Sequence, residues 1–432
     1  ISCSLVGSEM CIRDRYRNGE FMKNIRQFHL LSSILGGVFL FSSCSVVPKA
    51  EEKNLSEQWP VVASYQWAGQ DSVVVCDLSL LKDTVDLPFS FFLKDFQIIK
   101  LDNRDEAMVG ENNLCVSENY ILVYGSVYEL HPCRLFTKKG EFVTNIGAIG
   151  QGPGEYRAVY KAEIDEKHNC IYLMPFANSN AIYVYDLAGK PLRSIPLHQS
   201  VSKAVFKVDA DKRELTVGAL PFTGYPFVAW VQDFEGHLLD SVPAARHLSV
   251  LPDYSNEVMY GANTEVFDFY ISTFFELRPD TLYHYIRSGS RLKPRFTLNI
   301  GDRKRSITTF YELPQAYVGR LMVEEQVGDG MWETKSPSNF IVDKASLRGT
   351  FFRVINDFAG GMPDRLWTPW SLRNKQYIRL VEPGVLKAEI ESYLSSTDGR
   401  KGKNRKKLQE LCESIGEEDN SYVIYAKQKG VQ

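Results

Sequence analysis

The sequence lacks the motifs that identify many hydrolases and metal enzymes. It has no Gly-x-Ser-x-Gly elbow and no His-Glu-x-x-His pair. It also lacks an excess of charge of either sign, with 50 Lys and Arg residues against 53 Asp and Glu. A protein that binds DNA or RNA needs a basic surface for the phosphates. We therefore expect no nucleic-acid partner, and the sequence indicates no cofactor.

Cysteines in metal-binding or paired spacing are missing as well. Three of the eight cysteines lie in the first 44 residues, and the others are scattered without any Cys-x-x-Cys spacing: Cys76, Cys115, Cys133, Cys170 and Cys412. An odd number without clusters argues against a zinc site and against a disulfide framework. Because Cys115 and Cys170 lie in apolar runs, we expect them to be small buried hydrophobic residues.

No apolar run reaches the roughly 20 residues that a membrane-spanning helix needs. The run Leu30–Phe41 has only twelve residues, follows the basic residues Lys23 and Arg26, and precedes Ser-Ser-Cys at 42–44. This pattern resembles a bacterial lipoprotein signal with its lipobox. We predict a signal peptide over residues 22–43, lipid attachment at Cys44, a tether over 44–60 and a folded domain over 61–432. A plain signal peptide that happens to precede Cys44 is the alternative.

The residues before Met22 look unlike the rest of the chain. Leu5–Asp14 reads LVGSEMCIRD and resembles a translated transposon-type sequencing adapter. We interpret residues 1–21 as an artefact, with adapter up to Arg15 and upstream read-through after it. A genuine but unusual N-terminus is the alternative.

Short strand-like segments with a regular spacing dominate the middle of the chain. They are rich in β-branched and aromatic residues and end at turn residues. Glycines expected in hairpin turns, at positions 140, 189, 236 and 289, are 49, 47 and 53 residues apart. A four-stranded propeller blade has about 40 to 50 residues. The spacing therefore predicts an all-β fold, a six-bladed β-propeller, with five or seven blades as alternatives.

Two further features concern the last blade. We predict that a strand near Ser72–Leu78 pairs with the final strand, Ser421–Tyr425, because this pairing would close the ring. Leu386, Ile390 and Leu394, and then Leu408, Leu411 and Ile415, recur at helical spacing. They predict a small C-terminal helical insertion near 385–416, after which the chain returns to a strand.

Four segments resemble the six-bladed β-propeller lipoproteins of gut Gram-negative anaerobes, which are NHL-like or TolB-like propellers. In chain order they are Ile146–Tyr156; Pro279–Tyr283 with Lys293–Phe296; Asn356-Asp357 with Gly360-Gly361 and Trp367–Pro369; and Glu417–Tyr425. The family usually has Pro where this chain has Ser421. The resemblance implies a lipidated propeller and brings no agreed catalytic residues.

The resemblance also bears on location. Some relatives are displayed on the cell surface when acidic residues closely follow the lipidated Cys, but Glu51 and Glu52 lie seven and eight positions after Cys44. We therefore expect attachment to the outer membrane of the cell envelope, facing the periplasm rather than the surface.

Candidate sites are weak. The glycine-rich loop Gly147–Tyr156 invites an anion-cradle interpretation, but it lacks the Lys-Ser/Thr of a P-loop, and a blade-to-blade connection explains it better. Glu155 and Arg157 flank this loop at an expected funnel mouth and are the only ligand-binding candidates. We predict no catalytic residue and no metal ligand. Histidines on several blades, as in NHL-type lyases, leave a central metal as an alternative.

The basic run Arg400–Lys407 is expected to be a solvated loop between the helices rather than a lipid-binding or partner-binding patch. The leading hypothesis for function is a lipid-anchored binding or scaffold module for a protein, peptide or glycan. The rival is a metal-dependent propeller enzyme of the lactonase, lyase or hydrolase type. A purely structural envelope component is a third alternative.

Overall fold

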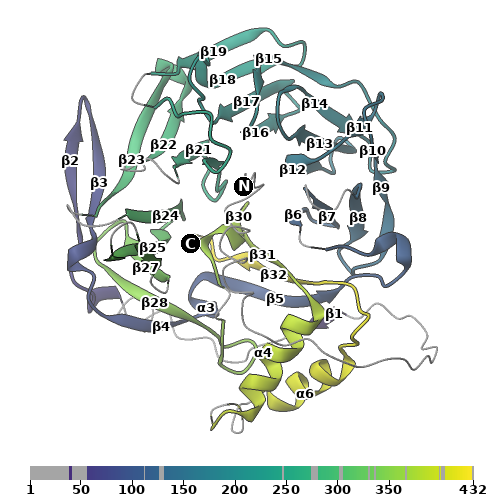
Figure 1. Cartoon of the computed structure of the whole chain (residues 1–432), viewed down its shortest axis with the longest axis vertical. Helices are drawn as coiled ribbons and strands as arrows, with labels where there is room; N and C mark the ends of the chain where they lie inside the picture. Colours follow the sequence, from purple (N-terminus) through teal and green to yellow (C-terminus); the bar gives the residue numbers. More distant parts are fainter. Residues whose placement is uncertain are drawn as a thin grey trace.

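Six sheets stand around a central axis like the blades of a propeller (Figure 1). The structure is a computed structural model that describes residues 38–40, 56–110, 112–125, 131–245, 248–273, 281–300, 305–328, 331–334, 337–364, 367–397, 399 and 404–430. The prediction of an all-β, six-bladed propeller with a small C-terminal helical insertion is confirmed.

The first three blades are four-stranded antiparallel sheets whose strands follow one another from the axis to the rim. Blade 1 has β6 (Asn113–Val116), β7 (Tyr120–Tyr124), β8 (Cys133–Thr137) and β9 (Phe142–Ile146). Blade 2 has β12 (Val159–Asp165), β13 (Cys170–Pro175), β14 (Ser179–Tyr185) and β15 (Ile195–Val201). Blade 3 has β16 (Ala204–Asp209), β17 (Glu214–Ala219), β18 (Phe227–Asp233) and β19 (Leu238–Pro243).

The turn between the third and fourth strands of blade 1 shows why a glycine recurs there. Gly140 has φ of +89°, and a Cβ at this position would overlap the carbonyl oxygen of Lys100. Both the left-handed conformation and the close approach of another backbone require glycine. The hairpin spacing in the sequence therefore reports a real steric constraint.

Blades 4 and 5 are extended at the rim by strands from the N-terminal part of the chain. Blade 4 has β20 (Glu257–Met259), β21 (Asp268–Ser272), β22 (Thr281–Ile286) and β23 (Arg291–Asn299), followed by β3 (Asp71–Asp77) and β2 (Ala63–Ala68). Blade 5 has β24 (Arg305–Glu312), β25 (Ala316–Gly328), β27 (Ser338–Asp343) and β28 (Gly349–Asn356), with β26 (Met331–Thr334), β29 (Met362–Pro363) and β4 (Thr84–Pro88). Both β3 and β4 add in parallel to the outer strand of their blade.

Blade 6 closes the ring, but not with the strand expected from the sequence. Its strands are β30 (Leu372–Arg373), β31 (Gln376–Val381), β32 (Tyr422–Gln428) and β5 (Leu93–Lys100). The final strand β32 therefore pairs with β5, and the predicted pairing with Ser72–Leu78 is wrong because β3 lies in blade 4. Phe96, Ile98 and Ile99 of β5 are all buried, so this strand fills both faces of the closing sheet.

A short strand, β1 (Val38–Leu40), pairs with the outer edge of β5. It falls inside the predicted signal peptide. The rest of that peptide, Cys44 and the adapter-like residues lie outside the described residues. Within the described part of the chain, no helix has the length and apolar character needed to cross a membrane.

The loop after β5 is held by Asn420, which belongs to the C-terminal segment Glu417–Tyr425 that the family resemblance singled out. The side chain of Asn420 donates to the carbonyl oxygens of Asp102 and Ala107 at 2.7 and 2.8 Å. Its Oδ1 atom accepts from the backbone N–H of Val109 at 3.0 Å and of Ser421 at 2.8 Å. The motif thus has a structural role, because one buried amide ties the end of the ring to its beginning.

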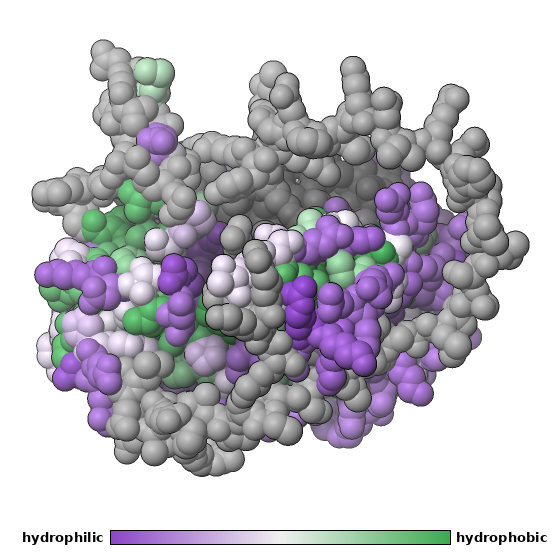
Figure 2. Space-filling view, turned by 90° about the horizontal axis from the view of Figure 1, so that it is seen from below, coloured by the Kyte–Doolittle hydropathy of each residue, from purple (hydrophilic) through white to green (hydrophobic). Residues whose placement is uncertain are grey.

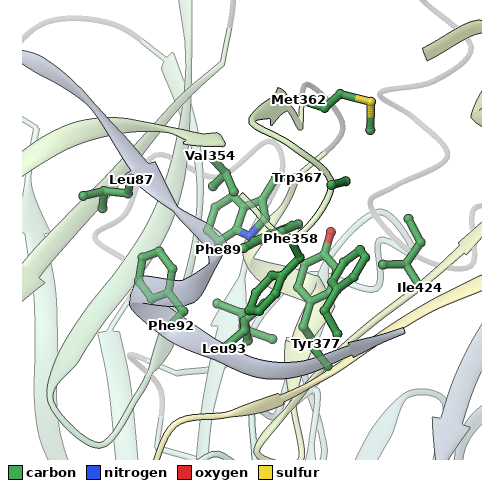
Figure 3. Packing of buried hydrophobic residues seen from close by; sticks show 14 of the residues in the cluster. Leu87, Phe89, Phe92, Leu93, Val354, Phe358, Met362, Trp367, Tyr377 and Ile424 are labelled. Carbon is green, nitrogen blue, oxygen red and sulfur yellow. The ribbon is translucent and has the colours of Figure 1, made fainter. Parts of the chain in front are cut away.

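Two helices, α4 (Pro383–Ser395) and α6 (Arg405–Ser414), lie between β31 and β32. Their apolar sides join the largest hydrophobic core together with the short helix α3 (Phe89–Phe92) and strands of blades 5 and 6. Figure 3 shows part of this core, in which Trp367 lies among Phe89, Phe92 and Val354. Trp367 of the family motif is therefore a core residue.

Candidate functional site

The glycine-rich loop lies at the rim between blades 1 and 2, as the position of β10 (Ala148–Ile149) and β11 (Glu155–Tyr156) in Figure 1 shows. It packs against Pro191, which follows an outer hairpin turn, rather than at a funnel mouth. The Glu155 carboxylate accepts a hydrogen bond from the backbone N–H of Gly152 at 2.8 Å. The loop therefore places its own carboxylate where an anion cradle would place a ligand. Arg157 is exposed beside it, and ligand binding by Glu155 and Arg157 stays a prediction.

The predicted histidines do not form a metal site in the described part of the chain. Three of them contact carboxylates at separate places: His168 contacts Asp165 in its own turn and Asp211 of blade 3, His237 contacts Asp233 in its own turn, and His284 contacts Glu312 of blade 5. No group of three or more His, Cys, Asp or Glu side chains able to hold a metal ion occurs among the described residues.

Charged side chains from several blades meet near the axis instead. Lys161 and Glu163 are two residues apart on β12, the innermost strand of blade 2, and both are half-buried. Electrostatic interactions link Lys161 to Arg373 on β30 of blade 6, and Glu163 to Lys207 on β16 of blade 3. We call Lys161, Glu163, Lys207 and Arg373 the axial cluster. Its three cations and one carboxyl group come from three blades and interact electrostatically, and the neighbouring Asp165 also acts on Glu163.

The hydrogen-bonding groups of the axial cluster are only partly used by contacts with other described residues. The Nζ atom of Lys161 lies 5.7 Å from the centre of the Tyr260 ring, and the Glu163 carboxylate accepts a long hydrogen bond of 3.4 Å from the backbone of Val208. The Nε atom of Arg373 is buried and has no hydrogen-bond partner among the described residues. A guanidinium whose Nε–H has no internal partner keeps hydrogen-bonding capacity for a carboxylate or phosphate group.

Burial and neighbouring charge shift both titrating groups of β12 toward neutral pH. Burial raises the pKa of Glu163 to about 7, although Lys161 opposes this shift. Burial, helped by repulsion from Arg373, lowers the pKa of Lys161 to about 8. The charge of the axial cluster therefore falls as the pH rises from about 6 to about 9.

A loop from blade 4 reaches past blade 5 to blade 6 close to the axial cluster. We call residues 260–267, between β20 and β21, the crossing loop. Its Asn263 donates to the carbonyl oxygen of Leu372 at 2.9 Å and accepts from the backbone of Lys375 at 3.1 Å. The backbone N–H of Asn374 donates to the Gly261 carbonyl at 2.9 Å. The loop thereby fixes Tyr260 beside Lys161 and holds the short strand β30 that carries Arg373.

Two buried ionic groups flank this region. Lys203, which is fully buried, contacts Glu257 at 2.5 Å, and the hydroxyl of Tyr160 donates to the same carboxylate at 2.6 Å. Between blades 4 and 5, Glu312 contacts both His284 and Lys344 at 2.5 Å. Although burial alone would raise the pKa of Glu312, these two partners hold it below its ordinary value. Because their charges are already matched, both groups join neighbouring blades rather than offer a free charge.

The basic run predicted between the helices is only partly described. Arg400–Lys403 lie outside the described residues, whereas Arg405 begins α6 and donates to the carbonyl oxygens of Leu394 and Gly399 at 2.9 and 3.0 Å. Figure 2 shows hydrophilic side chains gathered to the right of the centre of the face seen from below, and α4 and α6 lie at the bottom of Figure 1, which is the part turned toward the viewer.

Sequence reasoning missed the axial cluster. In the sequence, Lys161 and Glu163 alternate with apolar residues in a strand-like segment. This alternation is typical of any strand with one solvated face, so it does not indicate a site. Only the closed ring places this edge opposite Arg373, which is 212 positions later in the chain.

Comparison with solved structures supports the fold. A protein from Bacteroides fragilis that is described as exported shares 18% sequence identity, with a TM-score of 0.56, over 82% of this chain and 100% of its own. Two further solved structures are more distant. An auxiliary nutrient binding protein from Bacteroides thetaiotaomicron shares 14% sequence identity over 56% of each chain, with a TM-score of 0.33. A periplasmic gluconolactonase from Pseudomonas aeruginosa shares 10% sequence identity over 59% of this chain and 89% of its own, with a TM-score of 0.34. Their similarity is too low to bear on function.

No curated protein matches the chain. One family does, and its match runs from the strand β3 of blade 4 to the final strand β32, so that it includes all six blades. The chain belongs to the family described as domain of unknown function (DUF4934), which matches residues 73–427.

Proposed function

We propose that the protein is an exported binding module of the bacterial cell envelope, attached to the outer membrane through a lipid on Cys44, whose axial cluster binds an anionic group of a protein, peptide or glycan. The observation that carries the proposal is the set of electrostatic interactions that link Lys161 to Arg373 and Glu163 to Lys161 and Lys207 across three blades. The description of the Bacteroides fragilis protein with the same fold as exported supports the location.

The chemistry favours an anion because the three cations of the axial cluster outnumber Glu163 and the neighbouring Asp165. Lys161 and Arg373 are half-buried, so salt screens their field less than it screens that of fully exposed charges. The planar guanidinium of Arg373 can bind both oxygens of a carboxylate, while Lys161 supplies a point charge on a flexible stem. Carboxylates of acidic peptides and uronic acids have this chemistry.

A binding assay with defined probes tests the axial site. A glutamate-rich peptide and polygalacturonate are titrated into the protein, with neutral dextran as the uncharged comparison. We expect Arg373→Gln and Lys161→Gln to weaken binding of an acidic probe by about tenfold or more. Lys190→Gln, which changes an exposed lysine in an outer turn of blade 2, is the matched control and should bind like the wild type.

The pH dependence gives the assay a second readout. Protonated Lys161 and neutral Glu163 make the axial cluster most positive near pH 6, so affinity for an acidic probe should fall between pH 6 and pH 9. Equal binding of dextran, or identical affinities for the wild type and both variants, would contradict the axial site.

The anchor is tested separately. We expect metabolic labelling with palmitate in cells that express the full chain, and loss of the label in Cys44→Ala. Labelling that persists in this variant would refute the anchor without affecting the axial site. Elemental analysis of the purified protein addresses the rival metal-dependent enzyme: one transition metal per chain, together with no binding of acidic probes, would favour that rival.

A further inference from the structure

One hairpin stands away from the ring. The strands β2 and β3 are joined by the two-residue turn Gly69-Gln70, and Figure 1 shows their tip projecting beyond the rim of blade 4. The parallel pairing of β3 with β23 begins only at Val74, so the end of the hairpin extends past the sheet that supports it. Ser64 to Ala68 are all exposed, on both faces of the ribbon.

The exposed hairpin carries two large aromatic side chains on one face. Tyr65 and Trp67 are two positions apart on β2, so their side chains point the same way, and they are 61% and 81% exposed. The cross-strand partners of these residues are Val74 and Ser72. Residues 61–70 contain no charged side chain, and Asp71, the first charged residue after the turn, is paired with Arg291 of β23.

An aromatic tip whose one charged residue, Asp71, is ion-paired and mostly buried is suited to the boundary between water and lipid. Tyr and Trp combine an apolar ring with one polar group, and they are enriched where proteins meet the headgroup region of a bilayer. A glycan site usually offers several hydrogen-bonding side chains beside its rings, but here Gln66 lies on the opposite face and only the Ser72 hydroxyl stands beside Trp67. The chemistry of the tip therefore fits a lipid surface better than a sugar.

The position of the hairpin in the chain brings it close to the proposed anchor. Trp59 is buried in the main core, Arg348 donates to its carbonyl oxygen, and the backbone of Val62 donates to the Leu347 carbonyl at 3.0 Å. The chain is thus fixed to the ring just before β2. Cys44 precedes Trp59 by fifteen positions, which span at most about 50 Å when extended.

We propose that the β2–β3 hairpin is a membrane contact, in which Tyr65 and Trp67 enter the headgroup region of the bilayer that holds the lipid on Cys44 and so fix the orientation of the propeller. This inference rests on the proposed anchoring of the protein. A lipid chain alone leaves the ring free to rotate, whereas a second contact near the same point limits that freedom.

Vesicle binding tests the contact without the lipid. The full chain with Cys44→Ala is mixed with vesicles of phosphatidylethanolamine and phosphatidylglycerol in a ratio of about three to one, and the bound fraction is measured by co-sedimentation. Removing one large aromatic side chain from the headgroup region should weaken binding by about tenfold. We therefore expect this loss in both Tyr65→Ser and Trp67→Ser.

The matched control is Leu251→Ser, which removes a side chain that is 67% exposed and lies outside the hairpin. This variant should bind vesicles like the parent chain. Equal binding by the parent and the two hairpin variants would overturn the proposal, and so would a similar loss in the control.

Tryptophan fluorescence gives an independent readout that starts from the parent chain and needs only the conservative variant Trp67→Phe. Trp59, Trp230, Trp367 and Trp370 are buried, so iodide in solution should quench mainly Trp67 among the described tryptophan side chains. Vesicles should protect this signal from iodide, brominated lipids should quench it, and both effects should be absent in Trp67→Phe. Protection by a soluble glycan or peptide in place of vesicles would overturn the proposal.

The two proposals fail separately. If Cys44 takes up palmitate but the vesicle assays show no dependence on Tyr65 or Trp67, the hairpin contact is wrong and the anchor stands. If Cys44 takes up no palmitate while hairpin-dependent binding to vesicles persists, the anchor is wrong and the aromatic hairpin alone brings the protein to lipid.

Discussion

Replacing Asn420 by alanine should destabilise the ring more than any other polar truncation described above. The side chain is 1% exposed, donates to two backbone carbonyl oxygens and accepts from two backbone N–H groups. Asn420→Ala leaves all four groups without this partner. A buried group left unpaired costs about 1–3 kcal/mol, and water that enters the vacated space recovers part of the loss. We expect a decrease of about 3–5 kcal/mol in the free energy of unfolding.

Equilibrium unfolding in urea, followed by tryptophan fluorescence, measures this decrease. Asn119→Ala is the control, because its exposed amide donates to Glu166 at 2.8 Å and should contribute less than about 1 kcal/mol. A loss below about 1 kcal/mol in Asn420→Ala, with an unchanged dependence on urea concentration, would refute the role of this amide in ring closure.

Asn420→Asp distinguishes the hydrogen bonds that the side chain accepts from those that it donates. The substitution keeps both accepted hydrogen bonds but directs a carboxylate at the carbonyl oxygens of Asp102 and Ala107. The ionised form is disfavoured in the folded state, so the pKa of the new carboxyl group should be raised. Its destabilising effect should therefore be small at low pH and grow as the pH rises above about 4.

Three further substitutions test other parts of the fold. Gly140→Ala should lower the free energy of unfolding by at least about 2 kcal/mol, because its Cβ would overlap the Lys100 carbonyl oxygen and its φ is +89°. Gly69→Ala should lower it by about 1 kcal/mol, because a Cβ there meets no other atom. Thermal unfolding of the two variants measures the difference. Trp367→Ala should cost about 3–5 kcal/mol in urea unfolding, because the ring is buried in the main core, and a cost below about 1 kcal/mol would contradict that packing. Between pH 4.5 and about 7 the folded protein keeps the Glu163 proton that the unfolded chain loses, so the free energy of unfolding should fall by up to about 3 kcal/mol as the pH rises through this range. Glu163→Gln should flatten this pH dependence of stability. The same pH dependence in the variant and the wild type would contradict the raised pKa.

The ring could be predicted from the sequence because its turns repeat. Gly140, Gly189 and Gly236 each have a positive φ at the outer hairpin of blades 1, 2 and 3, and this constraint preserves their spacing, whereas in blade 4 Ser290 rather than Gly289 is left-handed. The closing strand could not be predicted in the same way. Val73–Cys76 and Phe96–Ile99 are both short apolar runs of similar character, and nothing local distinguishes the one that pairs with β32. The choice depends on which sheet offers a free edge at the correct distance.

The site shows a similar limit. The residues predicted from a motif, Glu155 and Arg157, belong to a loop that the sequence makes conspicuous through its glycines. The axial cluster has no motif, since Lys161 and Glu163 look like the solvated face of a strand. Their environment comes from neighbours on other blades, which become adjacent only when the ring closes. Long-range assembly, rather than local pattern, creates this site.

Closure of the ring by β5 also has a consequence in time. Val109, in the loop after β5, and Asn420 are 311 positions apart in the chain. At a synthesis rate of about 5–20 residues per second, β5 waits on the order of 15 to 60 seconds before β32 exists. During that interval the apolar side chains of Ile98 and Ile99 have no partner strand on the side that β32 later covers. The incomplete chain therefore exposes an unpaired, apolar strand edge for most of its synthesis. The yield of folded protein should depend on chaperones that bind such edges as much as on the stability of the finished ring.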